Sequence, residues 1–200
     1  MKMIADSEEI IQLFSKTISN IKVDKSFFNV VNEIVFCKNN NGKIITSGMG
    51  KAGIAMRKFS SILCSLGFPS VYLHPGEASH GDLGIIGEKD ILFLASTSGK
   101  TREVLEVLSL SRDLYVSKII GITSHLDSPL RKYCDIILDM GEIEEAKINS
   151  GFDFPPTSSI FAMLAITDTI AILSARKNGI TKEDYSKYHH GGYLGEMARR

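Results

Sequence analysis

Apolar positions recur along the chain with two different spacings, and the spacing changes near residue 40. Residues 7–37 carry apolar side chains three and four positions apart, which predicts two amphipathic helices that meet near Asp24. Short apolar runs follow, each separated from the next by turn residues and a helical pattern. Strands that alternate with helices pair in parallel, so the pattern predicts a three-layer αβα sandwich with a five-stranded parallel sheet.

The expected elements can be placed along the chain. Strands are expected at residues 43–46, 70–73, 90–95, 118–123 and 135–138. Helices are expected at residues 52–66, 101–114, 128–132 and 157–176, the last one following an irregular acidic loop. We expect a single domain over residues 1–200, with N-terminal helices at 7–37, an α/β core at 42–178 and a tail at 179–200.

Charge and cysteine content narrow the class of protein. The chain of 200 residues has 23 basic and 23 acidic side chains, and this balance argues against a nucleic-acid partner and a basic membrane-surface module. Cys37, Cys64 and Cys134 show no CxxC spacing and are interpreted as buried, reduced side chains. The N-terminus turns acidic too early for a signal peptide, and no run is expected to span a bilayer, so we expect a cytoplasmic protein.

The segment 91–112 carries the strongest functional signal. An apolar run ends at Ala95, and Ser-Thr-Ser-Gly-Lys-Thr follows at 96–101 before an amphipathic helix begins. Free backbone N–H groups and the helix dipole at such a junction favour an anion, to which short hydroxyl side chains donate. An ordinary N-cap is the alternative, but a cap uses one hydroxyl. Phosphate is therefore the expected occupant.

A glycine-rich turn precedes the first core helix. Ser-Gly-Met-Gly-Lys-Ala-Gly at 47–53 has neither the dinucleotide-binding spacing nor the Walker pattern. Lys51 lies where a helix begins, and a cation there opposes the helix dipole. The position of Lys51 therefore indicates an anionic partner.

Five motifs follow one another in order and carry a family resemblance. They are Ser-Gly-Met-Gly-Lys (47–51), His-Pro-Gly-Glu-Ala-x-His-Gly-Asp-Leu-Gly (74–84), Ser-x-Ser-Gly-x-x-x-Glu (96–103), Pro-Thr-Ser-Ser (156–159) and His-x-Gly-Gly-x-Leu-Gly (189–195). Together they resemble the sugar isomerase (SIS) domain of the arabinose 5-phosphate isomerases. The resemblance implies interconversion of D-ribulose 5-phosphate and D-arabinose 5-phosphate, for the synthesis of Kdo (3-deoxy-D-manno-octulosonate) used in lipopolysaccharide or capsule.

The chain departs from the family pattern at three places. Family members continue into a pair of CBS domains, whereas this sequence stops at Arg200, which leads us to expect a stand-alone form. The family's Ser-Asn-Ser-Gly-Glu is Ser-Thr-Ser-Gly-Lys at 96–100, which makes the expected phosphate site more basic. Its Ser-His-Pro-Gly-Gly is Tyr-His-His-Gly-Gly at 188–192, so two adjacent histidines stand where the family has one.

The resemblance assigns the catalytic roles. Isomerisation through an enediolate needs a base, a group that stabilises the oxyanion and a proton shuttle. His189 matches the family's essential histidine, Lys51 its lysine, and Glu103 a glutamate that orients Lys51 or a substrate hydroxyl; complementing the helix dipole is the alternative for Glu103. Glu145 aligns best with a further functional glutamate, with Glu144 and a solvated acidic loop as alternatives.

The remaining expected contacts are with substrate. Ser96, Thr97, Ser98, Thr101 and Gly50 are the expected phosphate-binding residues. The resemblance places His74, Glu77 and His80 in the sugar pocket, where the family can bind an inhibitory metal. An inhibitory zinc at His74 is possible, but these residues do not form a closed set of zinc ligands. We therefore expect no structural metal and no cofactor.

The resemblance also bears on the oligomeric state and on two alternative functions. In related SIS enzymes the C-terminal segment reaches a neighbouring subunit's pocket, so the resemblance implies a homo-oligomer, expected to be a tetramer. Two alternative functions stay open: a non-catalytic phosphosugar sensor, and an isomerase of another ketose phosphate. Retention of Lys51, Glu103 and His189 argues against the sensor, and the segment 74–83 argues against the other isomerase.

Overall fold

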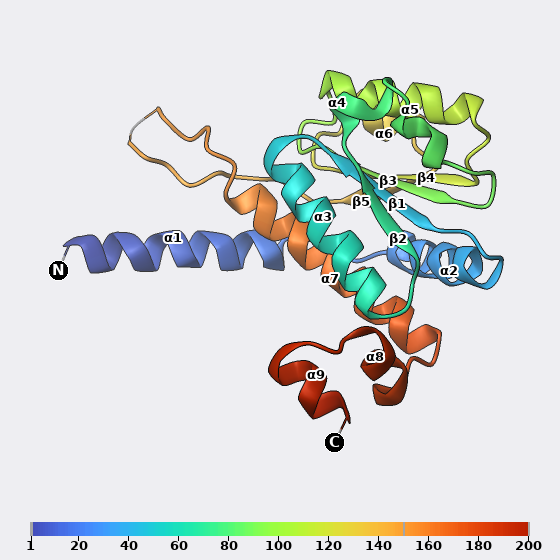
Figure 1. Cartoon of the computed structure of the whole chain (residues 1–200). Coiled ribbons are helices and arrows are strands. Elements are labelled where there is room, and N and C mark those ends of the chain that lie inside the picture. The colour runs from blue at the N-terminus through green and yellow to red at the C-terminus, as the bar shows by residue number, and fades with distance from the viewer. Residues whose placement is uncertain (1, 150, 200) are drawn as a thin grey trace.

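The expected parallel sheet is present. The computed structural model describes residues 2–149 and 151–199, so positions 1, 150 and 200 of the expected domain lie outside the described residues. Its five-stranded sheet has the order β2-β1-β3-β4-β5, with every neighbouring pair parallel (Figure 1). The strands are β1 (Ile44–Gly48), β2 (Ser70–Leu73), β3 (Ile91–Ala95), β4 (Lys118–Thr123) and β5 (Ile136–Asp139).

The expected helices are present, together with others that were not predicted. They are α1 (Lys2–Ser19), α2 (Lys25–Asn39), α3 (Gly50–Ser65), α4 (Pro75–Ala78), α5 (Arg102–Asp113), α6 (Pro129–Tyr133), α7 (Ser158–Lys177), α8 (Lys182–Tyr188) and α9 (Gly192–Arg199), with a 3-10 turn η1 (Asp82–Ile85). Asp24 separates α1 from α2 and caps α2 by accepting a bond of 2.8 Å from the Ser26 N–H. The expected helix pair is thereby confirmed.

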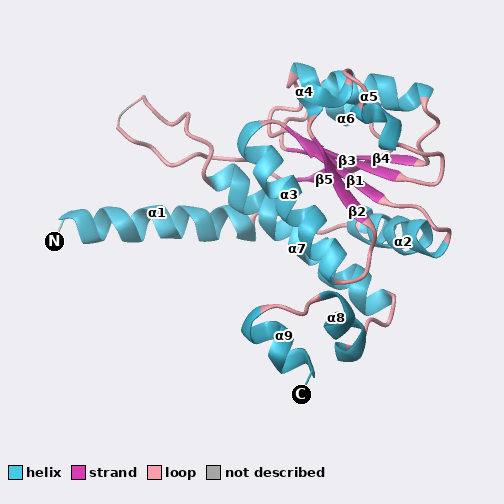
Figure 2. Cartoon of the chain, viewed as in Figure 1, coloured by secondary structure: helices cyan, strands magenta, loops and turns pink. Residues whose placement is uncertain are grey.

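The sheet separates two apolar layers, which confirms the αβα sandwich. Helices α2, α3 and α7 cover one face, and α4, α5 and α6 cover the other (Figure 2). Successive strand residues alternate between these layers: Phe93 packs with α3 and α7, whereas Leu92 and Leu94 pack with α5. Helix α1 lies outside the sandwich and contacts α7, where Phe14 and Phe161 have ring centroids 4.5 Å apart.

Helix α7 corrects one expectation. Among the described residues, Ser158–Lys177 forms a helix of 20 residues with mean hydropathy 1.7, long and apolar enough to cross a membrane by length and composition. The expectation that no run reaches that length was therefore wrong. Much of this helix is buried against α1, α2 and α3, because its apolar surface forms the centre of one core layer.

The cysteines match the expectation of buried side chains only in part. Cys37 is buried, and burial raises the pKa of its thiol to about 11. Cys134 is half-buried with its pKa raised by burial to about 12. Cys64 is exposed, because the buried face of α3 runs through Met56, Phe59 and Leu63 and position 64 faces outward. All three thiols are free.

The strand order creates a crevice between two neighbouring strands. The chain moves from β1 outward to β2 and then returns to β3 on the other side of β1. The loops that follow β1 and β3 therefore diverge to opposite faces, and ligands bind at such a point beyond the carboxyl ends of the strands. Gly48 at the end of β1 is paired with Ala95 at the end of β3, so the glycine turn and the Ser96–Thr101 segment begin side by side.

Candidate active site

A cavity of about 520 Å³ lies at this crevice. Its walls come from the start of α3, the loop after β3, the loop after β4 and the segment that leads into α7. The lining side chains include Met49, Lys51, Ala52, Ser96, Thr97, Ser98, Thr101, His125, Glu145, Asp153, Phe154 and Ser159. The structure thus brings Lys51 and the hydroxyls of residues 96–101 to one cavity.

The loop after β3 gathers its hydroxyls. Ser96 Oγ lies 2.9 Å from Thr101 Oγ1 and 3.5 Å from Ser98 Oγ, and the Gly99 N–H donates to Ser96 Oγ at 3.1 Å. Thr101 is the N-cap residue of α5, yet its side chain makes no capping hydrogen bond. The hydroxyl of Thr101 is therefore not used as an ordinary cap, which was the alternative reading of this segment.

Gly99 allows the loop to turn. Its φ of +62° is strained for residues with a side chain. A Cβ at this position would also lie 2.4 Å from Ser128 Oγ, on the segment that begins α6. Glycine at 99 therefore permits both the left-handed conformation and the close contact that hold the loop against α6.

The start of α3 is anchored from β2. Tyr72 Oη donates to the Gly48 carbonyl at 2.7 Å, and Gly53 lies so close that an added Cβ would be 2.4 Å from that oxygen. Burial raises the pKa of Tyr72, so its phenol stays a donor. No side chain caps α3 at its N-cap residue Met49, and Lys51 is exposed in the first turn. Gly50 lies between them but is not among the lining residues.

Glu145 links the acidic loop to α7. Its carboxylate accepts from the Thr157 N–H at 2.7 Å and from the Ser159 N–H at 3.4 Å. A carboxylate at a helix N-terminus satisfies free N–H groups and complements the dipole. Glu144 faces solvent and forms an exposed ion pair with Lys147 at 3.6 Å. Of the two glutamates, Glu145 is the one that lines the cavity.

Four other expected residues lie outside the cavity wall. His74 caps the short α4, accepting from the Gly76 N–H at 3.2 Å, and is half-buried; Glu77 and His80 are exposed on the following turn. Glu103 is half-buried in the first turn of α5. None of these four is among the residues that line the cavity of about 520 Å³. The described residues contain no cluster of three or more His, Cys, Asp or Glu side chains arranged to hold a metal.

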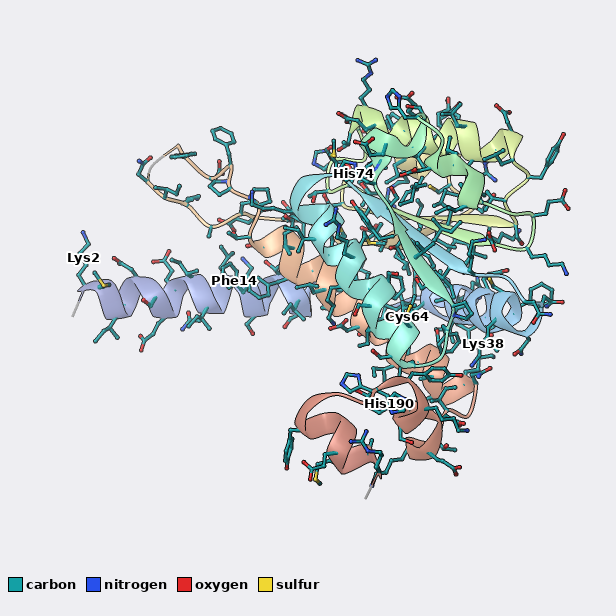
Figure 3. The ribbon with its side chains drawn as sticks, in the orientation of Figure 1. Lys2, Phe14, Lys38, Cys64, His74 and His190 are labelled. Carbon is teal, nitrogen blue, oxygen red and sulfur yellow. The ribbon has the colours of Figure 1, made fainter. Side chains whose placement is uncertain are left out.

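The two tail histidines lie far from the cavity in this chain. Tyr188 packs against Gly67, directly after the end of α3, whereas Lys51 is at its beginning. A helix of 16 residues is about 24 Å long, so His189 and Lys51 are separated by roughly that length. Figure 3 shows His190 in the tail at one end of α3 and His74 near the other. A single chain does not bring His189 to Lys51.

His189 and His190 make contacts within their own tail. The His189 ring stacks on Tyr185 with centroids 5.0 Å apart and planes inclined by 16°. His190 is exposed, and its carbonyl accepts from Arg199 at 2.9 Å. The tail itself contains α8 and α9, which the sequence analysis did not predict. The signal for α8 was readable, since Thr181 and Asp184 form a capping box at its start.

Sequence reasoning also missed residues that line the cavity. His125 lies two residues after β4, so the rule that sites lie beyond the carboxyl ends of strands could have found it. Ser159 is fully buried, and its hydroxyl has no hydrogen-bond partner among the described residues. Asp153 and Phe154 lie in an irregular loop whose path no periodic pattern predicts.

The fold and the cavity define the class of protein. A family model for the SIS domain matches residues 38–173, and the chain belongs to this family. Within the class, the chain is similar to the arabinose 5-phosphate isomerase KpsF of Escherichia coli, with 40% identity over 166 residues, which cover 83% of this chain and 50% of the relative. The chain spans about half the length of the curated relatives that it matches.

Two solved structures are similar over nearly their whole length. A Bacteroides fragilis protein, provisionally assigned as a phosphosugar isomerase involved in capsule formation, is 41% identical with a TM-score of 0.90, covering 96% of this chain and 99% of that one. The E. coli CFT073 protein c3406, solved in complex with A5P, is 27% identical with a TM-score of 0.86, covering 94% of this chain and 97% of that one.

Proposed function

We propose that this chain is an aldose–ketose isomerase that interconverts D-ribulose 5-phosphate and D-arabinose 5-phosphate. One observation carries the proposal: the hydroxyls of Ser96, Ser98 and Thr101 share a cavity with Lys51. Hydroxyls at the start of α5 suit a phosphate, and a lysine beside them suits a second developing negative charge. The 40% identity to an arabinose 5-phosphate isomerase supports this choice of substrate.

The proposed reaction moves one proton between adjacent carbons. A base removes a proton from C1 of the ketose, which gives an enediolate, and the proton is returned to C2 to give the aldose. A second proton passes between the oxygens on C1 and C2. Lys51 stabilises the enediolate or the phosphate, and Ser96, Thr97, Ser98 and Thr101 hold the phosphate with Gly50 beside them. The family resemblance is the support for the remaining roles, since none of these four residues lines the cavity in a single chain: Glu103 orients Lys51 or a substrate hydroxyl, and His74, Glu77 and His80 contact the sugar.

Glu145 has a supporting role in this proposal. Its carboxylate already accepts hydrogen bonds from the start of α7, so it fixes the wall of the cavity. Ser159 belongs to the same wall, and its buried hydroxyl has no hydrogen-bond partner among the described residues. We therefore assign Glu145 to positioning and leave proton transfer to a histidine.

His189 is proposed to act in the cavity of another copy. This requires a homo-oligomer, and the expected tetramer gives the tail of each chain a neighbouring cavity. Exposed apolar side chains on α1 supply a surface for such packing, since Met3 is 80% exposed, Ile4 64% and Ile11 65%. A groove of about 750 Å³ between α1 and residues 144–148 adds to that surface.

The proposed cellular role follows from the product. We propose a cytoplasmic enzyme whose D-arabinose 5-phosphate serves Kdo synthesis for lipopolysaccharide or capsule. The Bacteroides fragilis relative, assigned to capsule formation, supports this role.

A phosphosugar sensor is the second candidate. It is favoured by the distance between His189 and the cavity in a single chain, because a sensor needs the phosphate site but no acid–base group. NMR of the purified chain with D-ribulose 5-phosphate separates the two. Appearance of the aldose signals and exchange of the transferred hydrogen with D₂O are expected from the isomerase. Binding without conversion, by a protein confirmed as an oligomer, would support the sensor.

A further inference from the structure

His125 occupies a fixed place beside the hydroxyl loop. It follows β4, which pairs with β3, so the loops after these two strands emerge side by side. Three hydrogen bonds join them at one atom: the Thr97 carbonyl accepts from Thr123 Oγ1 at 3.1 Å and from the Ser124 N–H and Oγ at 3.1 and 3.0 Å. The backbone before His125 therefore cannot move independently of the loop that holds Ser96 and Ser98.

The backbone on the other side of His125 is held as well. Arg131 Nε donates to the His125 carbonyl at 3.1 Å, and the same guanidinium pairs with Asp139 at 3.1 Å. This arrangement fixes the main chain of residue 125 while its side chain lies at the cavity wall. Within the described part of the chain, the imidazole itself makes no hydrogen bond or ion pair. The backbone is therefore held in position, and the exposed ring remains available to a ligand.

The charge around the cavity shows what the ring can contribute. Lys51 is the fully cationic side chain among the described residues that line it, and Glu145 and Asp153 bring two carboxylates. With a neutral imidazole the wall carries one more negative than positive charge, although its proposed ligand is a phosphate. Histidine gains a positive charge near neutral pH. An imidazolium at position 125 would balance these charges and offer the phosphate a second cation.

We infer that His125 is a phosphate-binding residue of this cavity, pairing as the imidazolium with the phosphate group of the sugar. This inference rests on the proposed function for the identity of the sugar, but the binding of phosphate stands apart from turnover. The cavity also continues past His125 into a second one of about 710 Å³, which Thr97, His125 and Glu145 share with Lys22 and Asp139. His125 thus lies between the two cavities, beside the loop that carries the proposed phosphate site.

Two variants separate the contribution of the charge of the His125 side chain to phosphate binding from that of its shape. His125→Gln keeps a hydrogen-bond donor of similar size but removes the charge, and His125→Lys restores a cation on a flexible side chain. Asp127→Asn, two residues further along the same exposed loop and outside this cavity, controls for loosening of the loop. The dissociation constants of inorganic phosphate and D-arabinose 5-phosphate are measured by calorimetry at about pH 6, together with kcat and KM.

His125→Gln is expected to weaken both ligands about tenfold and raise KM to match, with kcat within about twofold, as for loss of a charge-assisted hydrogen bond. His125→Lys and Asp127→Asn should stay within about threefold of the parent. An unchanged phosphate affinity in His125→Gln would overturn the inference, and so would equal losses in the Gln and Lys variants. If the parent binds both ligands without isomerising them, the proposed function fails while the His125 result still decides this inference.

Discussion

The loop after β3 and the C-terminal tail carry the two halves of the proposed chemistry, and they are built differently. The loop begins at a buried strand, and Ser96 is only 3% exposed within a cluster of bonded hydroxyls. The tail lies on the surface, where α8 packs mainly through Tyr185 and Tyr188. One half is fixed by the sheet of its own chain, and the other is presented outward.

This difference separates binding from proton transfer. A phosphate site needs backbone N–H groups and hydroxyls at one helix start, and a single βα unit supplies them. Acid–base catalysis needs a histidine against the sugar carbons, and the tail of the same chain is a helix length away. We therefore expect changes in the loop to act on KM and changes in the tail to act on kcat.

The largest effect is expected in the tail. His189→Asn should lower kcat about a hundredfold or more with little change in KM, because general acid–base catalysis is lost. His190→Pro should leave kcat within several-fold of the parent, because the family has proline at this position and proline restricts the backbone to the turn that the family uses. Steady-state kinetics of both variants decide the assignment. An inactive His190→Pro beside an active His189→Asn would transfer the role to His190 and leave His189 packing on Tyr185.

Changes in the loop after β3 should instead raise KM and leave kcat less affected. Ser98→Ala combined with Thr101→Ala should raise KM for the phosphosugar strongly, each lost charge-assisted hydrogen bond costing about 1.5–3 kcal/mol. The effect on kcat should be smaller, because neither hydroxyl is proposed to touch the reacting carbons. A double variant with an unchanged KM would show that the phosphate binds elsewhere.

The next effect is expected at the cavity wall that Glu145 shares with the hydroxyl loop. Glu145→Ala removes the acceptor for the Thr157 and Ser159 N–H groups and should lower the free energy of unfolding by about 1–3 kcal/mol. Glu144→Ala is the matched control, and its exposed ion pair should contribute less than about 0.5 kcal/mol. Urea denaturation of both variants gives the comparison. Equal losses would mean that Glu145 does not hold the start of α7.

A smaller, pH-dependent effect is expected in α8. Its Asp184 has a lowered pKa because the carboxylate accepts hydrogen bonds from Lys187 and Thr181. A carboxyl group whose pKa is lowered by folding stabilises the folded state at pH values above its ordinary pKa, near 4. This stabilisation is lost as the pH falls from that value through the lowered pKa. Hydrogen exchange, corrected for intrinsic rates, should therefore show α8 losing protection below about pH 4 before α5 does. Asp184→Asn should remove this pH dependence, and equal loss in α5 and α8 would contradict the local origin.

The sequence predicted the sheet and the hydroxyl-rich loop well because the signal for each is local. Apolar runs such as Ile91–Ala95 define buried strands, and the hydroxyl-rich segment after Ala95 is adjacent to the helix start that it serves. The burial of Cys64 and the length of the apolar run in α7 were misjudged, because apolar composition alone cannot separate a buried face from an exposed one, or a core helix from a membrane span.

The arrangement of the site was less accessible from sequence. His125, Asp153 and Ser159 reach the cavity from three separate segments, and their proximity to Lys51 depends on tertiary packing. The capping contact between Glu145 and Thr157 likewise joins residues twelve apart through an irregular loop. No pattern in one chain places His189, because the proposed partner of that residue belongs to another copy.

Subunit mixing tests the divided site most directly. His189→Asn chains keep the hydroxyl loop, and Ser98→Ala/Thr101→Ala chains keep the tail. If each cavity receives its histidine from another copy, mixed oligomers made by co-expression should contain intact sites and recover about a quarter of the parental kcat/KM at equal proportions, with the substrate kept well below the KM of the loop variant. If the tail serves its own cavity, mixed oligomers verified by mass spectrometry should show no more than the average of the two variants, and that result would contradict the divided site.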